Sequence, residues 1–185
     1  MELPSRQKIR VIKLFDLYQC DKKDRLRFIL GKEGAKKLFV IGLNPSTANK
    51  EKTDTTAAKV EQVALQNGFD GFVMANLYPL RSTDPKGLHK RKNTELFESN
   101  LHCIFELARK ERELIIWAAW GGDIESRRYL RESFFRLEKM IKKLGGRWIH
   151  YGQLRKDGHP RHPSRLSYAW QFQTFDTSHY LGDLK

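Results

Sequence analysis

Short apolar runs recur along the chain, and each run ends at glycine or at polar residues. The clearest run covers residues 38–43 and is followed by Asn44 and Pro45. A short β-branched and aromatic run bounded by turn residues is typical of a buried strand. The same pattern predicts three further strands, at residues 71–76, 113–120 and 147–151.

Between these strands the apolar residues recur at helical spacing, which predicts helices at residues 55–67, 94–112 and 124–144. In the first of these helices the spacing places Ala58, Val63, Ala64 and Leu65 on the inward face. Asp54 precedes this helix, where its carboxylate can accept amide protons of the first turn. We therefore expect Asp54 to be the N-cap.

The N-terminal part of the chain predicts a separate hairpin. Two candidate strands lie at residues 11–18 and 26–30, and the polar turn at residues 21–24 joins them. We expect this hairpin to lie at the edge of the sheet and to form an extension over residues 1–36.

Strands that alternate with helices require crossover connections, and these favour a parallel sheet covered by helices on both faces. We therefore predict an α/β fold: a three-layer α/β/α arrangement around a central, mainly parallel four-stranded sheet, with the hairpin at its edge. A length of 185 residues suits one domain, so residues 1–185 are expected to fold as a single unit.

The composition of the chain limits the classes of protein to which it can belong. Hydrophobic residues make up 39% of the chain, enough for a core, but no apolar run reaches the ~18 residues of a membrane helix. The first residues lack the layout of a signal peptide, and Cys20 and Cys103 lie far apart without a histidine pair nearby. We expect a cytoplasmic monomer without contact to a membrane, without a metal site and without a cofactor.

The formal net charge of +13 points to a polyanionic partner. Nucleic acid is the commonest such partner. Cationic side chains that neutralise its phosphates release counterions, and this release favours binding. An acidic membrane surface or simple solubility are the alternative explanations.

The polar residues after the first central strand are candidates for chemistry. Gly42 is expected to let the chain turn sharply, and Pro45 restricts its own backbone and that of Asn44. Ligand sites in open α/β sheets gather at the carboxyl ends of strands. Asn44 is therefore a candidate site residue, although it is also a common turn former.

Four polar motifs follow the four predicted strands in order: GLNPS at 42–46, MAN at 74–76, AAWG at 118–121 and HPSRLS at 162–167. Their order resembles that of the uracil-DNA glycosylase superfamily, from about Lys37 to Ser167. Over nearly the full length the chain also resembles the DUF1643 family, which shares NPSTA, the NLYP and TDP segment, the WG pair and the GHPRHP tail. The resemblance implies a uracil-DNA glycosylase-like fold and an enzyme that hydrolyses the bond between a base and deoxyribose.

The resemblance assigns two catalytic residues. Asn44 matches the first-motif position, where its carbonyl oxygen would orient a water molecule. His162 matches the second-motif histidine, whose N–H would stabilise the charge of the departing base. His159 is the alternative catalytic histidine, because the HPRHP segment holds two.

Further roles follow from the same resemblance. Asn76 would read a pyrimidine edge, and Ser46, in place of a bulky tyrosine, would leave room for 5-substituted pyrimidines. The aromatic residue that stacks on the base stays open among Phe69, Phe72 and Tyr78, and Tyr78 is counted with the base-recognition residues. Asp54 is a second candidate catalytic carboxylate. Contacts to DNA are assigned to Arg161, Ser164, Arg165, Ser167 and, as the wedge that enters the base stack, Leu166.

The sequence therefore predicts a monofunctional DNA glycosylase that removes an aberrant or modified pyrimidine from DNA. The alternative is a binding module that recognises modified DNA or a nucleotide without cleaving it. An enzyme acting on free nucleotides is a third reading, but the GLNPST segment lacks the lysine and glycines of a phosphate-binding loop.

Overall fold

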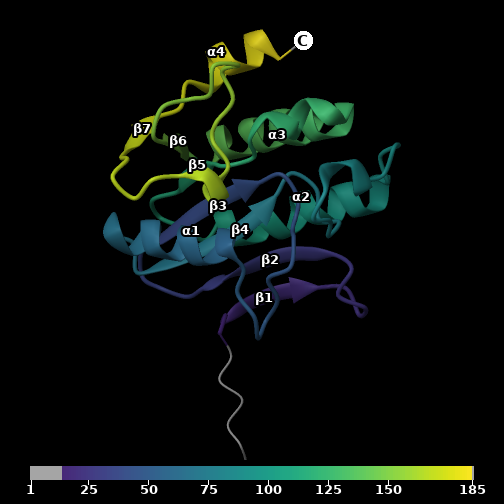
Figure 1. The fold of residues 1–185 in the computed structure, drawn as a ribbon, viewed down its shortest axis with the longest axis horizontal. Helices are drawn as coiled ribbons and strands as arrows, with labels where there is room; N and C mark the ends of the chain where they lie inside the picture. The colour runs from purple at the N-terminus through teal and green to yellow at the C-terminus, as the bar shows by residue number, and fades with distance from the viewer. Residues whose placement is uncertain (1–13, 185) are drawn as a thin grey trace, which may run out of the picture.

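The computed structural model describes residues 14–184 and contains one seven-stranded sheet with the strand order β1-β2-β4-β3-β5-β6-β7. Figure 1 shows this sheet running through the whole molecule. The strands are β1 (Leu17–Cys20), β2 (Arg27–Lys32), β3 (Lys37–Gly42), β4 (Gly71–Asn76), β5 (Ile115–Ala118), β6 (Arg147–Tyr151) and β7 (Phe172–Thr174).

The sheet is mixed. β3 pairs in parallel with β4 and with β5, and β5 pairs in parallel with β6, whereas β1, β2 and β7 join through antiparallel pairs. The predicted α/β class is confirmed, but the sheet has seven strands where four and an edge hairpin were expected. The additional strand is β7, which lies in the aromatic tail and pairs with β6. Its three residues are too few for an alternation of apolar and polar residues to predict a strand.

The N-terminal hairpin is present. β1 and β2 pair antiparallel, and the turn between them is closed when Asp21 N donates to Leu26 O and Leu26 N donates to Asp21 Oδ1. β1 forms the edge of the sheet, as predicted. The first residues of the predicted strand, 11–13, lie outside the described part of the chain.

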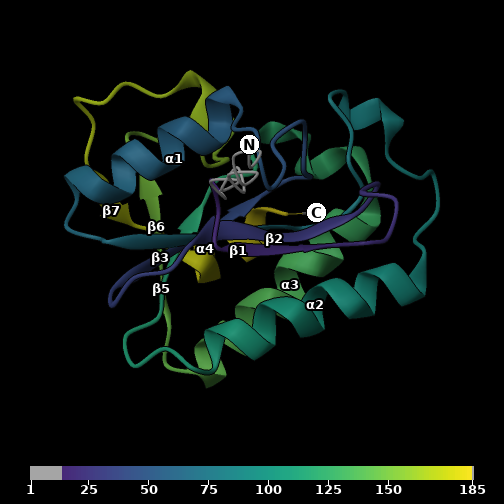
Figure 2. The same cartoon turned by 90° about the horizontal axis from the view of Figure 1, so that it is seen from below.

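Helices cover both faces of the sheet. Figure 2 shows α1 (Thr55–Gln66) on one face and α2 (Thr94–Ala108) with α3 (Arg128–Lys143) on the other. The C-terminal helix α4 (Thr177–Asp183) packs through Tyr180 on the side of α3. Within residues 14–184 no helix combines the length and the apolar content needed to cross a membrane.

The inward face of α1 differs from the prediction. Ala57, Val60, Val63 and Ala64 are buried, whereas Ala58 is exposed and Leu65 is 57% exposed. The prediction is confirmed for Val63 and Ala64 and wrong for Ala58 and Leu65, because alanine is uninformative and the helix orientation is set by its contact with the sheet. Asp54 is the N-cap, as expected: its side chain accepts from Ala57 N.

Two other helices are shorter than predicted. α2 ends at Ala108 instead of Arg112, and α3 begins at Arg128 instead of Ile124. The segment before α3 forms the 3-10 helix η2 (Gly122–Ser126), and Arg127 has an extended backbone that separates the two helices.

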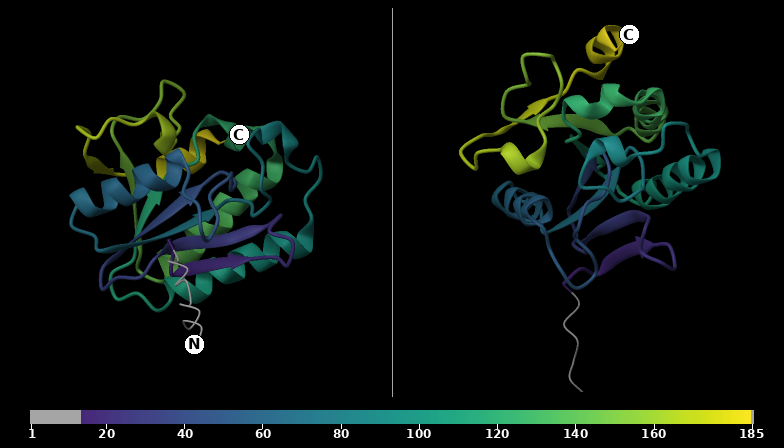
Figure 3. Two further views of the ribbon diagram at one scale, coloured as in Figure 1. Left: turned by 60° about the horizontal axis from the view of Figure 1, so that its bottom comes forward. Right: turned by 45° about the vertical axis from the view of Figure 1, so that its right-hand side comes forward.

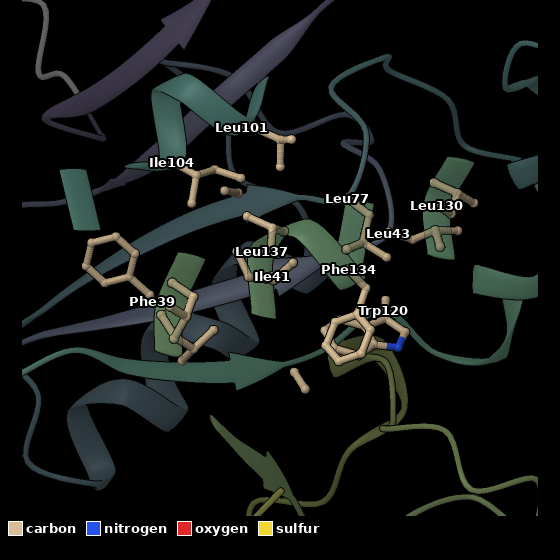
Figure 4. Close-up of a cluster of buried hydrophobic side chains, with 14 of the residues drawn as sticks. Phe39, Ile41, Leu43, Leu77, Leu101, Ile104, Trp120, Leu130, Phe134 and Leu137 are labelled. Carbon is tan, nitrogen blue, oxygen red and sulfur yellow. The ribbon is translucent and has the colours of Figure 1, made fainter. Parts of the chain in front are cut away.

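An aromatic cluster joins α3, β6 and the C-terminal segment on the face of the sheet that α3 covers. Trp120 lies at its centre, with ring contacts to Phe134, Trp148, Phe175 and Tyr180. Figure 4 shows Trp120 and Phe134 side by side among the aliphatic side chains of this core. Ring pairs of this kind add stability beyond the apolar area that they bury.

Two neighbouring phenylalanines of α3 test this description. Phe134 is 0% exposed, whereas Phe135 is 44% exposed. We expect Phe134→Ala to lower the free energy of unfolding by about 3–5 kcal/mol, because it leaves a cavity in the core. Phe135→Ala should cost at most about 0.5 kcal/mol. Urea denaturation of both variants measures the difference, and equal losses would contradict the packing.

Candidate functional site

A cavity of about 360 Å³ opens where the parallel strands end. Gly42 and Asn76 are paired in the register of β3 and β4, and Ala119 follows β5; all three line the cavity. The remaining walls come from the loops after β3 and β4, from η2 and from the segment around η3 (Pro163–Arg165). The volume lies in the range of pockets that bind small molecules.

The segment between β6 and β7 closes the cavity on one side. It carries η3 and arches over the α1 face of the sheet, as the yellow-green loop in Figure 3 shows. Lys59 Nζ of α1 donates to Ser164 O at 2.9 Å, which ties η3 to the helix. The chain thereby brings His162 to the ends of strands that precede it by more than forty residues.

Gly42 has a different role from the predicted turn. It is the last residue of β3, and it is not among the residues with positive φ. A Cβ at this position would lie 2.7 Å from Asn76 Oδ1. Glycine is therefore required because the Asn76 side chain crosses over its backbone, and the chain does not turn sharply there.

Asn44 is held by its amide nitrogen. Nδ2 donates to Ser82 O at 2.8 Å and lies within hydrogen-bond range of Pro45 O and Leu80 O. Three carbonyl acceptors leave only one way to orient the amide. Among the described residues, Oδ1 accepts no hydrogen bond, so the oxygen is the atom of Asn44 that remains for a ligand in the cavity.

Asn76 lines the same cavity and is 2% exposed. Its main-chain oxygen accepts from Asn100 Nδ2 at 2.8 Å, which anchors the end of β4 to α2. Its side-chain Nδ2 is buried without a hydrogen-bond partner among the described residues. A buried amide N–H without a partner is costly, and a ligand acceptor in the cavity would relieve that cost.

His162 lines the cavity, and one of its ring nitrogens is engaged by the protein. Ser164 N donates to His162 Nδ1 at 3.3 Å, and Ser164 Oγ lies 2.8 Å from the same nitrogen. Because Nδ1 accepts, the proton of the neutral ring sits on Nε2. Burial lowers the pKa of His162 below its usual value of 6.5, with Arg165 acting in the same direction and Asp54 opposing it. The imidazole is thus a neutral N–H donor near pH 7.

Gly121 lies beside this histidine, and its backbone conformation requires glycine. Its φ of 75° and ψ of −168° lie in a region that is almost restricted to glycine. A Cβ at Gly121 would lie 3.5 Å from His162 Cβ. The WG pair of the sequence therefore shapes the wall against which His162 rests.

The alternative histidine lies elsewhere. His159 is 5% exposed, does not line the cavity, and is within 2.8 Å of Tyr180 Oη through Nδ1. Its Nε2 lies 3.4 Å from Glu125 Oε1. His159 therefore joins the aromatic core to η2, and the cavity position belongs to His162.

Basic and hydroxyl side chains surround the mouth. Ser46, Arg161, Ser164 and Arg165 all line the cavity, and the last two are exposed. Arg161 donates to Gln153 O at 2.8 Å and stacks over the Trp170 ring. Four residues assigned from the sequence to base or DNA contacts are thus placed together.

Three assigned residues lie outside the cavity lining. Tyr78 is fully buried in the core, where its hydroxyl lies 2.9 Å from His89 Nδ1 and its ring packs against Tyr129. Leu166 is 8% exposed in the core beside α1, which leaves no exposed side chain to enter a base stack. Ser167 is exposed on the surface beyond the cavity.

No aromatic residue from the stacking candidates reaches the cavity. Phe69 and Phe72 are buried in the core on the α1 face, with exposed fractions of 6% and 1%. The aromatic side chain among the lining residues is Trp120, which sequence reasoning had not assigned.

Asp54 lines the cavity as well as capping α1. Oδ1 accepts from Ala57 N at 2.8 Å and Oδ2 accepts from Ala48 N at 3.0 Å. Both oxygens are therefore engaged with the main chain, and this carboxylate joins the loop after β3 to the start of α1.

Two arginines in the lining were missed by sequence reasoning. Arg27 lies at the start of β2, far from any motif, and is 2% exposed. Arg155 binds Asp157 with Nη2 at 2.8 Å from Oδ2, and this hydrogen bond lowers the pKa of Asp157 to about 2. The one available signal for Arg27 was a charged residue inside an otherwise apolar strand.

The described residues contain no cluster of metal ligands. Among residues 14–184, no three His, Cys, Asp or Glu side chains gather in a way that could hold a metal ion.

The fold and the cavity define an α/β protein with a mixed seven-stranded sheet and a basic cavity at the ends of its parallel strands. A family model described as "Protein of unknown function (DUF1643)" matches residues 27–164, and the chain belongs to this family. The match spans every cavity-lining residue except Arg165. No curated protein and no solved structure matches the chain.

The protonation of His162 is directly testable. We expect its pKa to lie below 6.5, because burial disfavours the imidazolium. A lowered histidine pKa makes the folded state lose stability as the pH falls below about 6.5, where the unfolded chain takes up the proton. NMR titration of the ring signals, assigned with His162→Gln, measures the midpoint. A midpoint above that of the unfolded chain would contradict the site described above.

Proposed function

We propose that this protein is a monofunctional DNA glycosylase that hydrolyses the N-glycosidic bond of a flipped, aberrant or modified pyrimidine. The observation that carries the proposal is the convergence of Asn44, Asn76 and His162 on one cavity. These residues come from three separate loops or strand ends. Asn44 and His162 each offer a polar atom suited to one part of the reaction, and Asn76 offers a buried donor for binding.

The proposed hydrolysis needs a positioned water molecule and a stabilised leaving group. Oδ1 of Asn44 accepts a hydrogen bond from the water, which attacks the sugar carbon as the bond to the base breaks. Nε2–H of His162 donates to the base oxygen, where negative charge collects. The base leaves with the bonding electron pair and is then protonated, and water supplies the hydroxyl of the abasic sugar.

The residues of the cavity favour hydrolysis over covalent catalysis. A glycosylase that also cuts the strand needs an amine to form a Schiff base with the sugar. None of the described residues that line the cavity is a lysine. The product is therefore an abasic site in an intact strand.

The mouth of the cavity suits DNA. Exposed Arg165 and Ser164, together with Arg161, offer cationic and hydroxyl contacts to phosphates beside the flipped nucleotide. Ser46 is small, so a base with a substituent at its 5-position fits beside it. Hydroxymethylated or glycosylated cytosines of phage DNA are substrates of this kind, and both DNA repair and antiviral defence are settings for the activity.

The second candidate is a binding module that recognises a modified base or nucleotide without cleavage. The amide of Asn44 favours it, since Nδ2 is committed to the loop after β4 and a carboxamide cannot act as a strong base. Both candidates require the cavity to accept a base, and they differ in whether product forms.

An assay with modified duplexes separates the two. Duplexes that carry uracil, a thymine mismatch or 5-modified cytosine are incubated with the protein and then treated with alkali, which cuts abasic sites. We expect Asn44→Ala to lower cleavage by about 10²-fold or more, because the attacking water loses its acceptor and the loop loses the hydrogen bond to Ser82 O. DNA binding should stay within about threefold, because the basic side chains at the mouth are unchanged.

Gln66→Ala is the matched control. Gln66 carries the same carboxamide group, lies exposed at the end of α1 and does not line the cavity, so the activity of this variant should equal that of the unaltered protein. Salt-dependent binding without any strand breaks on the whole set of duplexes would reject the enzyme and leave the binding module.

A further inference from the structure

Arg27 is a buried cation that forms no ion pair among the described residues. It is 2% exposed, and among the described residues the only hydrogen bond of its side chain runs from Nη1 to Ala48 O at 2.9 Å. Nε is buried without a partner, and the ion pairs of the described chain do not include Arg27. Arg27 is nevertheless among the residues that line the cavity.

The surroundings make this charge costly. Burial lowers the pKa of Arg27 to about 10, and the neighbouring Arg81 acts in the same direction, while Asp54 opposes it. At neutral pH the group is still protonated. A buried charge without a paired carboxylate carries a desolvation penalty that a hydrogen bond to one carbonyl does not offset.

The carboxylates near the cavity form no ion pair with Arg27, although Asp54 acts on its charge from a longer distance. Asp54 accepts main-chain N–H groups with both oxygens, and Asp157 is engaged by Arg155. Asp123 also lines the cavity, but it is exposed and forms no ion pair with Arg27. No carboxylate among the described residues pairs directly with Arg27, so an anion that enters the cavity would complete its pairing.

A second buried donor lines the same space. Asn76 Nδ2 has no hydrogen-bond partner among the described residues, and Asn76 ends the strand that β2 pairs with. Arg27 N donates to Pro79 O, in the segment that follows Asn76. Both groups are donors, so the ligand that satisfies them presents acceptors.

We propose that Arg27 and Asn76 form an oxyanion subsite in the wall of the cavity, which binds a phosphate group. A phosphate carries the charge that Arg27 needs and several acceptor oxygens, which suit a guanidinium and an amide N–H together. The group has two possible sources, a phosphate of the DNA backbone and the phosphate of a free nucleotide. The subsite goes beyond the proposed function, because it requires binding and no cleavage.

The first experiment measures inorganic phosphate. Thermal unfolding and calorimetric titration are followed as phosphate replaces chloride at constant ionic strength, since a chain of net charge +13 responds to salt in general. We expect phosphate to raise the Tm of the unaltered protein and Arg27→Gln to weaken binding by about tenfold or more. Arg91→Gln removes the same charge at an exposed position outside the cavity and should bind as the unaltered protein does.

A second variant covers the possibility that Arg27→Gln does not fold. Asn76→Asp keeps the size of the side chain and places a carboxylate in the wall of the cavity that Arg27 also lines, so phosphate binding should fall by about tenfold or more. Without phosphate this variant should keep or exceed the Tm of the unaltered protein, because Arg27 gains a counterion. A merely structural role of Arg27 would lower the Tm of Arg27→Gln and leave its phosphate affinity unchanged.

The source of the phosphate follows from two further ligands. Thymidine 5′-monophosphate is compared with thymidine, and a single-stranded oligonucleotide is tested in parallel, each with Arg27→Gln. Loss of affinity for the nucleotide but not for the nucleoside assigns the subsite to free nucleotides, and loss confined to the oligonucleotide assigns it to the DNA backbone.

Three results would overturn the subsite. The first is that phosphate does not change the Tm of the unaltered protein, and the second is that Arg27→Gln binds phosphate as tightly as the unaltered protein does. The third is that Arg27→Gln weakens the binding of inorganic phosphate but of no nucleotide or oligonucleotide, which would mark an adventitious ion only. A protein that binds phosphate through Arg27 but cleaves no DNA would keep this subsite and reject the glycosylase.

Discussion

Hydrogen bonds between the loops after β3 and β4 hold the cavity open in one shape. Asn44 Nδ2 of the first loop donates to Ser82 O of the second, and Arg81 Nη1 of the second donates back to Ser46 O and Ala48 O of the first. Arg81 Nη2 also pairs with Asp24 in the N-terminal hairpin at 3.0 Å. The hairpin is therefore a support for the candidate site, because it holds the guanidinium that fixes the loop carrying Asn44.

The hydrogen bonding between these two loops has a chemical consequence. It commits the amide nitrogen of Asn44 to the protein, which leaves its oxygen for the cavity, while Ser164 commits Nδ1 of His162 and leaves Nε2–H. One acceptor and one donor thus face the same space without competing partners. Preorganised polar atoms of this kind can orient a ligand without a further ordering cost of their own, whether the ligand is cleaved or only bound.

Much of the fold was predictable because it depends on local patterns. The strands β4 and β6 begin and end where the apolar runs predict, and Asp54 caps α1 as expected. Strand ends and a motif resemblance singled out Asn44, Asn76 and His162, and the three residues line one cavity. Tyr78 and Leu166 were not placed correctly, because an aromatic or aliphatic residue beside a motif packs equally well into the core, and only the neighbouring helices decide which it does.

By itself the sequence determined the α/β class, the parallel strands that precede the site and the polar residues at their ends, since apolar periodicity and turn chemistry act over a few residues. Only the tertiary structure decided that Arg27 reaches the cavity, that Gly42 is needed to admit Asn76, and that His162 rather than His159 lines the wall. Each of these depends on contacts between segments far apart in the chain, and no local pattern carries that information.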